Sequence, residues 1–114
     1  MRPKVFNDIN DFSGQDLEPV SSILIFDYSN NQNVDCSLNY ISGVTEGQHL
    51  SIFYLNRNTT PGNLRIDFGD NNIVTGSGAN SYLTFTTFGQ SAELLAYGTT
   101  NNYLVFNTGA TASS

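Results

Sequence analysis

The chain has 114 residues, of which 12% are charged, and its formal net charge at neutral pH is −6. Its four basic residues are scattered between positions 2 and 65, so it lacks the clustered Lys and Arg that bind nucleic-acid phosphates or anionic membranes. We therefore expect neither nucleic acid nor membrane as a partner. The sequence contains no run of 18 apolar residues and no apolar signal core after residues 1–4, so a bilayer span or a secretory signal is not expected. This length fits one domain with a short appendage.

Residues 1–19 differ in character from the rest of the chain. They hold four of the ten acidic residues but no apolar run of strand length. Phe6, Ile9 and Phe12 recur at every third position, and disordered termini usually lack such large apolar anchors. We predict that residues 1–19 form an attachment arm that docks through these three side chains on a capsid or tail protein, or on a sister subunit. A loose tail is the alternative.

Residues 20–114 are predicted to form one all-β domain. Short apolar or alternating runs are separated by Gly, Asn, Asp and Thr about every ten residues, which is typical of a sandwich or barrel. In chain order the predicted strands are 20–27, 34–41, 49–56, 63–68, 72–75, 81–86, 92–97 and 102–106. We expect a small antiparallel sandwich of jelly-roll-like architecture, with 98–101 as a hairpin loop and a frayed tail at 107–114.

Two of the predicted strands are apolar on both faces. Residues 23–26 and 50–55 read ILIF and LSIFYL, so we expect both strands to be covered on both sides. The low charge also leaves few residues that would block pairing between exposed strand edges. The chain therefore has more apolar strand surface than one small sandwich uses, and self-association is expected.

Residues that carry catalysis or bind metals are sparse. His49 and Cys36 are the only His and Cys, whereas zinc sites usually take several such ligands. Cys36 alternates with apolar neighbours and is interpreted as a small buried side chain, with a reactive thiol or an interchain bridge as the alternatives. Asp67 and the run 70–72 could together offer oxygens to Ca²⁺, but turn formation explains 70–72 equally well. We predict a protein that is not an enzyme and has no cofactor or resident metal.

The six tyrosines lie in or beside predicted strands. An exposed tyrosine can stack on a sugar or anchor an interface, whereas a tyrosine at the rim of the core points its hydroxyl to water. Tyr28 and Tyr54 adjoin the polar loops 27–35 and 56–63, so they are candidate contacts for a glycan or receptor. A receptor- or glycan-binding adhesion module is therefore the alternative function.

The order of features from residue 34 onward follows a known arrangement. A strand leads into GQHLSIF at 47–53, then LRIDF at 64–68 and a polar turn at 69–72, a strand at 81–86, and a final hairpin at 92–97 and 103–106. This order resembles the small β domain at the C-terminus of many bacteriophage tail-spike and fibre proteins, over about two-thirds of the chain. In that family the domain is trimeric and locks or caps a longer fibre.

The chain departs from that family at both ends. The usual final Trp-Tyr-Glu and basic ending is replaced by YLVF and a small polar tail, and only about nineteen residues precede the β region. The resemblance therefore implies a surface-exposed virion structural protein such as a head fibre, a capsid decoration protein or a tail-fibre component. It implies a homotrimer in which second-half strands pack about a threefold axis. The residues expected in the core or the trimer interface are Leu83, Phe85, Leu95 and Phe106.

Overall fold

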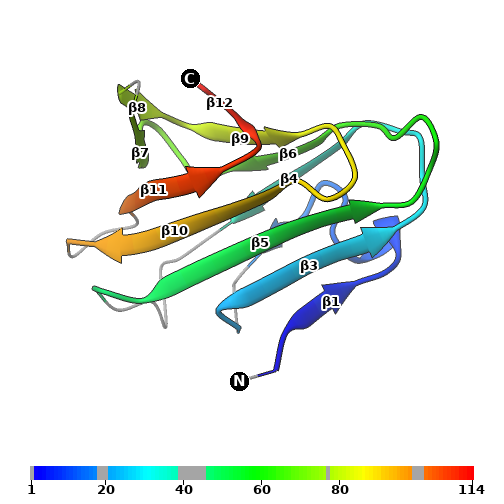
Figure 1. Cartoon of the computed structure of the whole chain (residues 1–114), viewed down its shortest axis with the longest axis horizontal. Helices are drawn as coiled ribbons and strands as arrows, with labels where there is room; N and C mark the ends of the chain where they lie inside the picture. The colour runs from blue at the N-terminus through cyan, green and yellow to red at the C-terminus, as the bar shows by residue number, and fades with distance from the viewer. Residues whose placement is uncertain (1, 18–20, 39–45, 77, 99–101) are drawn as a thin grey trace.

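A computed structural model of the chain describes residues 2–17, 21–38, 46–76, 78–98 and 102–114. Within these residues two β-sheets lie one over the other and enclose an apolar core (Figure 1). The seven-stranded sheet has the order β1 (Lys4–Phe6), β3 (Ile23–Tyr28), β5 (His49–Asn56), β10 (Ser91–Tyr97), β11 (Asn102–Thr108), β7 (Ile73–Thr75) and β8 (Gly78–Asn80). The five-stranded sheet has the order β12 (Thr111–Ser113), β9 (Tyr82–Phe85), β6 (Leu64–Asp67), β4 (Val34–Leu38) and β2 (Asp16–Leu17). A single 3₁₀ turn, η1 (Ile9–Asp11), joins β1 to β2. The expected all-β, sandwich-like class is confirmed.

Alternation along each strand sends one set of side chains into the core. In β5, Leu50, Ile52 and Tyr54 are buried between the sheets, and the residues between them face the other way. The predicted strand 49–56 matches β5, and the hairpin predicted from 92–97 and 102–106 matches β10 and β11. Of the strand predicted at 34–41, the described part ends at Leu38, and 39–41 lie outside the described residues.

Strand direction differs from the expected antiparallel, jelly-roll-like arrangement. Both sheets are mixed: β3 runs parallel to β1 and β5, and β4 runs parallel to β2 and β6. The reason is that consecutive strands from β3 to β6 alternate between the two sheets. When the chain crosses to the opposite sheet and back, the returning strand points the same way as the strand beside it.

Both ends of the chain contribute strands to the sandwich. The strand β1 pairs with β3 at the edge of the larger sheet, and β2 pairs with β4 at the edge of the smaller one. Strands within residues 2–17 therefore pair into both sheets in this structure. The tail predicted to fray contains β12, which pairs with β9 along its whole length.

Candidate interaction surface

The seven-stranded sheet has an outer face on the side away from the smaller sheet (Figure 1). The residues on this face alternate with the buried ones along each strand. Register places Val5, Ile25 and Phe53 side by side on three adjacent strands. Further along the same face, Leu95 of β10 pairs directly with Leu104 of β11.

Several large apolar side chains on this face are open to solvent. The exposed fractions are 45% for Val5, 38% for Phe53, 39% for Leu104 and 54% for Phe106. Folded monomers rarely expose a contiguous apolar patch of more than a few hundred Å² unless it serves an interaction. We call this surface the outer patch, and it consists of Val5, Ile25, Phe53, Leu95, Leu104 and Phe106.

A β-bulge brings Phe106 to the outer patch. The pairing of β10 with β11 shifts between Glu93 and Leu94, so that Glu93 faces Asn107 and Leu94 faces Val105. Phe106 is the extra residue of the bulge, a type of irregularity that redirects a side chain. Its ring stacks on the imidazole of His49, with ring centroids 5.0 Å apart. The sole histidine is therefore a neighbour of the outer patch.

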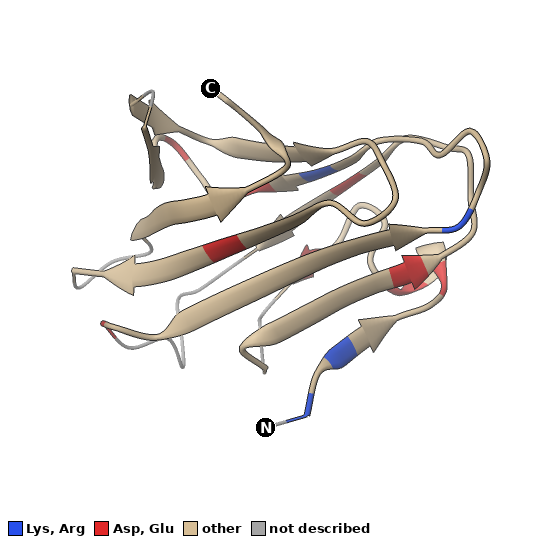
Figure 2. Cartoon of the chain, viewed as in Figure 1, with Lys and Arg blue, Asp and Glu red and all other residues tan. Residues whose placement is uncertain are grey.

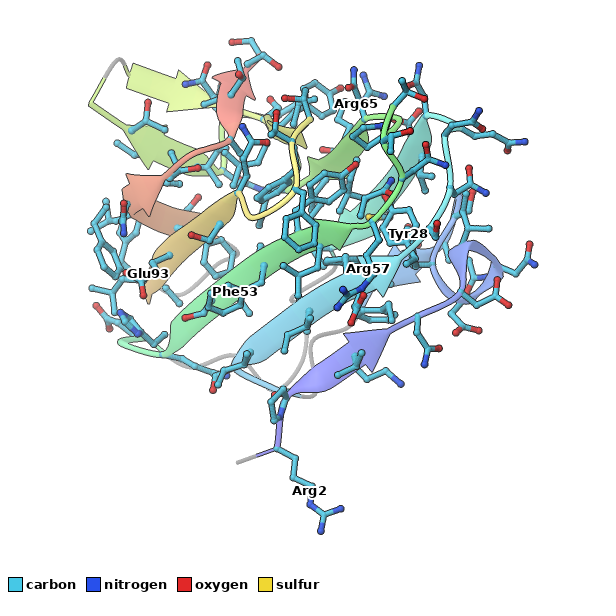
Figure 3. The ribbon with its side chains drawn as sticks, turned by 45° about the vertical axis from the view of Figure 1, so that its right-hand side comes forward. Arg2, Tyr28, Phe53, Arg57, Arg65 and Glu93 are labelled. Atoms are coloured by element: carbon cyan, nitrogen blue, oxygen red, sulfur yellow. The ribbon has the colours of Figure 1, made fainter. Side chains whose placement is uncertain are left out.

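Charge is sparse on the strands of the larger sheet (Figure 2). Asp27 at the end of β3 is neutralised by Arg57, whose Nε and Nη2 lie 2.7 and 3.2 Å from the two carboxylate oxygens. The hydrogen bonds from Arg57 lower the pKa of Asp27, and the carboxylate in turn raises the pKa of Arg57. Glu93 on β10 pairs with Ser51 on β5, and Phe53 is the next residue of β5 on the same face, whereas Arg65 belongs to the other sheet (Figure 3).

The outer side of the five-stranded sheet is polar and acidic. Asp16, Ser37 and Asp67 lie side by side on β2, β4 and β6. In the next row Asp35 is exposed and pairs with Arg65, whose Nε lies 3.2 Å from its Oδ1. The two broad faces of the sandwich therefore differ in kind, since one is apolar and nearly neutral and the other carries most of its charge as carboxylates.

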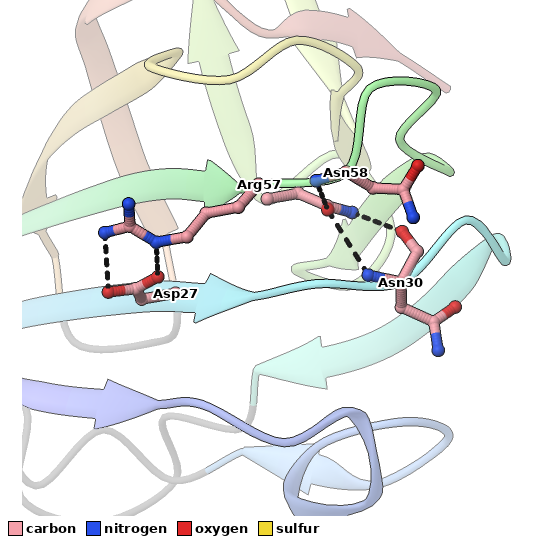
Figure 4. A network of polar contacts seen from close by, with 5 residues as sticks. Asp27, Asn30, Arg57 and Asn58 are labelled. Atoms are coloured by element: carbon pink, nitrogen blue, oxygen red, sulfur yellow. Dashed lines mark hydrogen bonds and ion pairs between the residues drawn. The ribbon is translucent and has the colours of Figure 1, made fainter.

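A polar network closes the end of the sandwich where β3 and β5 finish (Figure 4). The buried side chain of Asn56 donates to the carbonyl of Asn30 at 2.7 Å and accepts from the backbone N–H of Asn58 at 3.0 Å. The hydroxyl of Tyr54 donates to the carbonyl of Gly62 and accepts from Asn56 Nδ2 at 3.2 Å. These side chains hold the two polar loops against the core.

The two tyrosines expected to contact a glycan lie inside the protein, which corrects that expectation. Tyr54 is fully buried, and Tyr28 is buried against it with ring centroids 6.1 Å apart. Burial raises the pKa of the Tyr28 hydroxyl far above its ordinary value. Both rings point into the core because they alternate in phase with the other inward residues of β3 and β5.

The side chains expected to anchor an arm are also placed in the chain's own core. Phe12 is fully buried and Phe6 nearly so, while Ile9 is partly buried and packs against the core. Phe6 stacks on Phe26 with centroids 4.8 Å apart. As they lie here, Phe6 and Phe12 are not open to a capsid or tail protein, because the hydrophobic effect has placed both rings in the core.

The four residues expected in the core or the trimer interface divide between two places. Leu83 and Phe85 are fully buried between the sheets, so they cannot form an interface. Leu95 and Phe106 belong to the outer patch. Sequence reasoning did not single out Phe53 or Leu104, although the apolar character of both faces of 50–55 was a signal for Phe53.

The groups considered for catalysis and metal binding do not assemble into a site in the part of the chain that the structure describes. Cys36 is buried, and burial raises the pKa of its thiol to about 12. No group of three or more His, Cys, Asp and Glu side chains converges among the described residues. An open cavity of about 240 Å³ includes Asp16 and Asp67, but Asp67 Oδ1 already accepts the Gly69 N–H at 2.8 Å and fixes a turn.

Among the described residues no helix is long and apolar enough to cross a membrane. Comparison with protein-family models finds no match to this chain, and comparison with curated proteins finds none that is significant. The outer patch and the polar end of the sandwich are therefore two surfaces that could contact a partner.

Proposed function

We propose that this chain is a structural protein of a bacteriophage virion that acts without catalysis. In this proposal it is a homotrimer exposed on the particle surface, as a head fibre, a capsid decoration protein or a tail-fibre component. The observation that carries the proposal is the outer patch, a set of apolar side chains left open on the broad face of a small sandwich. A surface of this kind serves assembly, since it offers contact area and no reactive group.

Two properties of the sequence support the same proposal. Its low content of charge and its order of strands and turns resemble the trimeric domains of phage spikes and fibres. The route of attachment to a capsid or tail protein is revised, because residues 2–17 pair into both sheets. We propose that attachment uses a folded surface of the trimer and not a free N-terminal arm.

The direct test is mass spectrometry of gradient-purified particles of the virus that encodes this chain. The proposal expects the chain in the particle fraction at a constant ratio to the major capsid protein. Its absence from intact particles, while it is expressed in infected cells, would overturn the proposed virion role. Immunogold labelling of the particles then distinguishes a head location from a tail location.

A receptor- or glycan-binding module is the second candidate. Phe88, in the loop between β9 and β10, is 52% exposed and lies beside Arg57, whose Cζ is 5.9 Å from the ring centroid. This ring adjoins the Asn-rich loop 56–63. In this second proposal Phe88, and not Tyr28 or Tyr54, is the aromatic side chain that stacks on a sugar. Binding on an array of bacterial surface glycans that Phe88→Ala removes would favour this function, and an array without hits would count against it.

A further inference from the structure

We infer that the outer patch is the surface through which copies of this chain bind one another. The occupant of the patch is thus another copy of the same chain. This inference rests on the proposed homotrimer and adds to it the face that is buried and the side chains that form the contact. Of the four residues expected in the core or the trimer interface, two lie in the core and two lie in the outer patch.

The first argument is the arrangement of apolar side chains across the sheet. Val5, Ile25 and Phe53 form one row on β1, β3 and β5, and Leu95 and Leu104 form another on β10 and β11, with Ser51 and Glu93 in the row between them. A row of apolar side chains across a sheet is the arrangement that packs against a second sheet in a sandwich. The inner face of this sheet already packs in that way, and the outer face repeats the pattern without a covering sheet in the single chain.

The second argument is charge. Each copy has a net charge of −6, so two copies repel unless their contact surface is nearly neutral. On the outer side of the larger sheet, Asp27 is neutralised by Arg57, and Glu93 is the remaining carboxylate among the described residues of β3, β5, β10 and β11. The smaller sheet instead presents Asp16 and Asp67, which would meet their own copies as like charges, together with an Asp35 that is paired with Arg65. Self-association is therefore favoured at the outer patch and disfavoured at the opposite face.

The third argument is area. Five adjacent strands, β1, β3, β5, β10 and β11, make up most of the outer face. With strands about 4.8 Å apart and about 3.3 Å per residue, these strands, which range from the three residues of β1 to the eight of β5, cover roughly 500 Å² as a flat surface. Side-chain relief increases this area toward the about 800 Å² per partner that is typical of stable interfaces. The face is therefore large enough to hold sister subunits.

The experiment uses the full chain and compares two charged substitutions in the outer patch with two elsewhere. Phe53→Asp and Phe106→Asp place a carboxylate in the patch, at side chains that the core does not need. Thr84→Asp places the same group at an outward position of a strand in the smaller sheet, next to Arg65. Phe88→Asp removes an equally exposed phenylalanine from a loop.

Mass is measured by light scattering after size exclusion over a range of concentrations, and folding is checked by circular dichroism. For a 12.5 kDa chain a trimer has about three times that mass. We expect each patch variant to raise the concentration for half-dissociation by about 30-fold or more, as the loss of a central apolar anchor does at other interfaces. The two control variants should keep the wild-type mass.

Oxidative footprinting of the unaltered chain gives a second measurement that does not depend on a variant folding. Phe53, Leu104 and Phe106 should become protected as the concentration rises through the association range, while Phe88 stays reactive. The inferred face is wrong if folded patch variants associate as the wild type does. It is also wrong if the wild type associates without protection of these three residues. Neither result contradicts the proposed trimer.

The stoichiometry of the wild-type chain tests the proposed function separately. A wild-type mass of two copies, lost in the patch variants, supports the inferred face and contradicts the trimer. A wild-type monomer at all concentrations contradicts both, and a different macromolecule would then be the occupant of the patch.

Discussion

Replacing Phe12 with alanine tests whether the N-terminal residues hold the fold together or merely precede it. Phe12 has no exposed surface and follows the 3₁₀ turn η1. Its ring makes edge-to-face contacts with Phe6, Phe26 and Tyr28, at centroid distances of 5.9, 5.1 and 5.0 Å. The ring therefore links the β1 edge of the sandwich to the inner face of β3.

The expected magnitude follows from this burial. Truncating a fully buried phenylalanine to alanine costs about 3–5 kcal/mol, because it combines lost burial with the cavity left behind. For a domain of this size each kcal/mol lowers the melting temperature by about 4 °C, so the expected drop is roughly 12–20 °C. Aromatic pairs of this kind add about 0.5–1.5 kcal/mol each beyond the burial of their area. The three contacts of Phe12 therefore place the expected loss in free energy of unfolding near the upper end of the range for a buried phenylalanine.

The assay is chemical unfolding in urea, followed by circular dichroism at one fixed protein concentration, because association stabilises the folded state. Phe88→Ala is the matched control, since Phe88 is mostly exposed and its loss should change the free energy of unfolding by less than about 0.5 kcal/mol. A loss below about 1 kcal/mol for Phe12→Ala would refute the reasoning. It would mean that residues 1–19 do behave as a dispensable arm.

Three further predictions concern backbone fit, thiol reactivity and pH. Gly62→Ala should destabilise the fold strongly in urea titrations, because its Cβ would lie 2.0 Å from a backbone carbonyl oxygen of the facing loop, whereas Gly76→Ala meets nothing within 4 Å and should be tolerated. Cys36 should resist a thiol reagent in the folded protein and react in urea, since burial raises its pKa to about 12; fast labelling under native conditions contradicts this. The ion pair with Arg57 lowers the folded-state pKa of Asp27, so its small stabilisation is present above the ordinary pKa of 3.8 and is lost as the pH falls through the lower folded value. Asp27→Asn should therefore flatten the acid limb of stability against pH, and an unchanged limb would contradict the assignment.

The position of strands was predictable because it depends on local pattern. Alternation and turn residues located β5, β6 and the β10–β11 hairpin to within a residue or two. The direction of the strands was not predictable in the same way. The same alternation of apolar and polar residues is found in a strand that is followed by a hairpin and in one that is followed by a crossing to the other sheet. The path of each loop therefore decides whether neighbouring strands are parallel, and the alternation does not specify that path.

The candidate surface was predictable only in part. The apolar character of both faces of 23–26 and 50–55 indicated that some outward apolar side chains are buried only by association. Leu95 and Phe106 were among the residues assigned to core or interface. The pattern could not tell which face of a strand is inward. Leu83 was therefore assigned to core or interface without a choice between them, and Tyr54 was a candidate surface contact, although both are fully buried. A bulge that shifts register between Glu93 and Leu94 also decides where Phe106 lies, and no residue in the sequence marks it.

Composition and local pattern were enough to identify a small all-β protein with little charge, few reactive side chains and an excess of apolar strand surface. Those properties depend on composition and on short-range periodicity, which are fixed before the chain folds. The tertiary structure decided that Phe6 and Phe12 complete the core and that Phe53, Leu104 and Phe106 stay open together on one face. These outcomes depend on which strands become neighbours. Strand neighbours are set by the close packing of two sheets around a shared core, which brings together residues that are far apart in the chain.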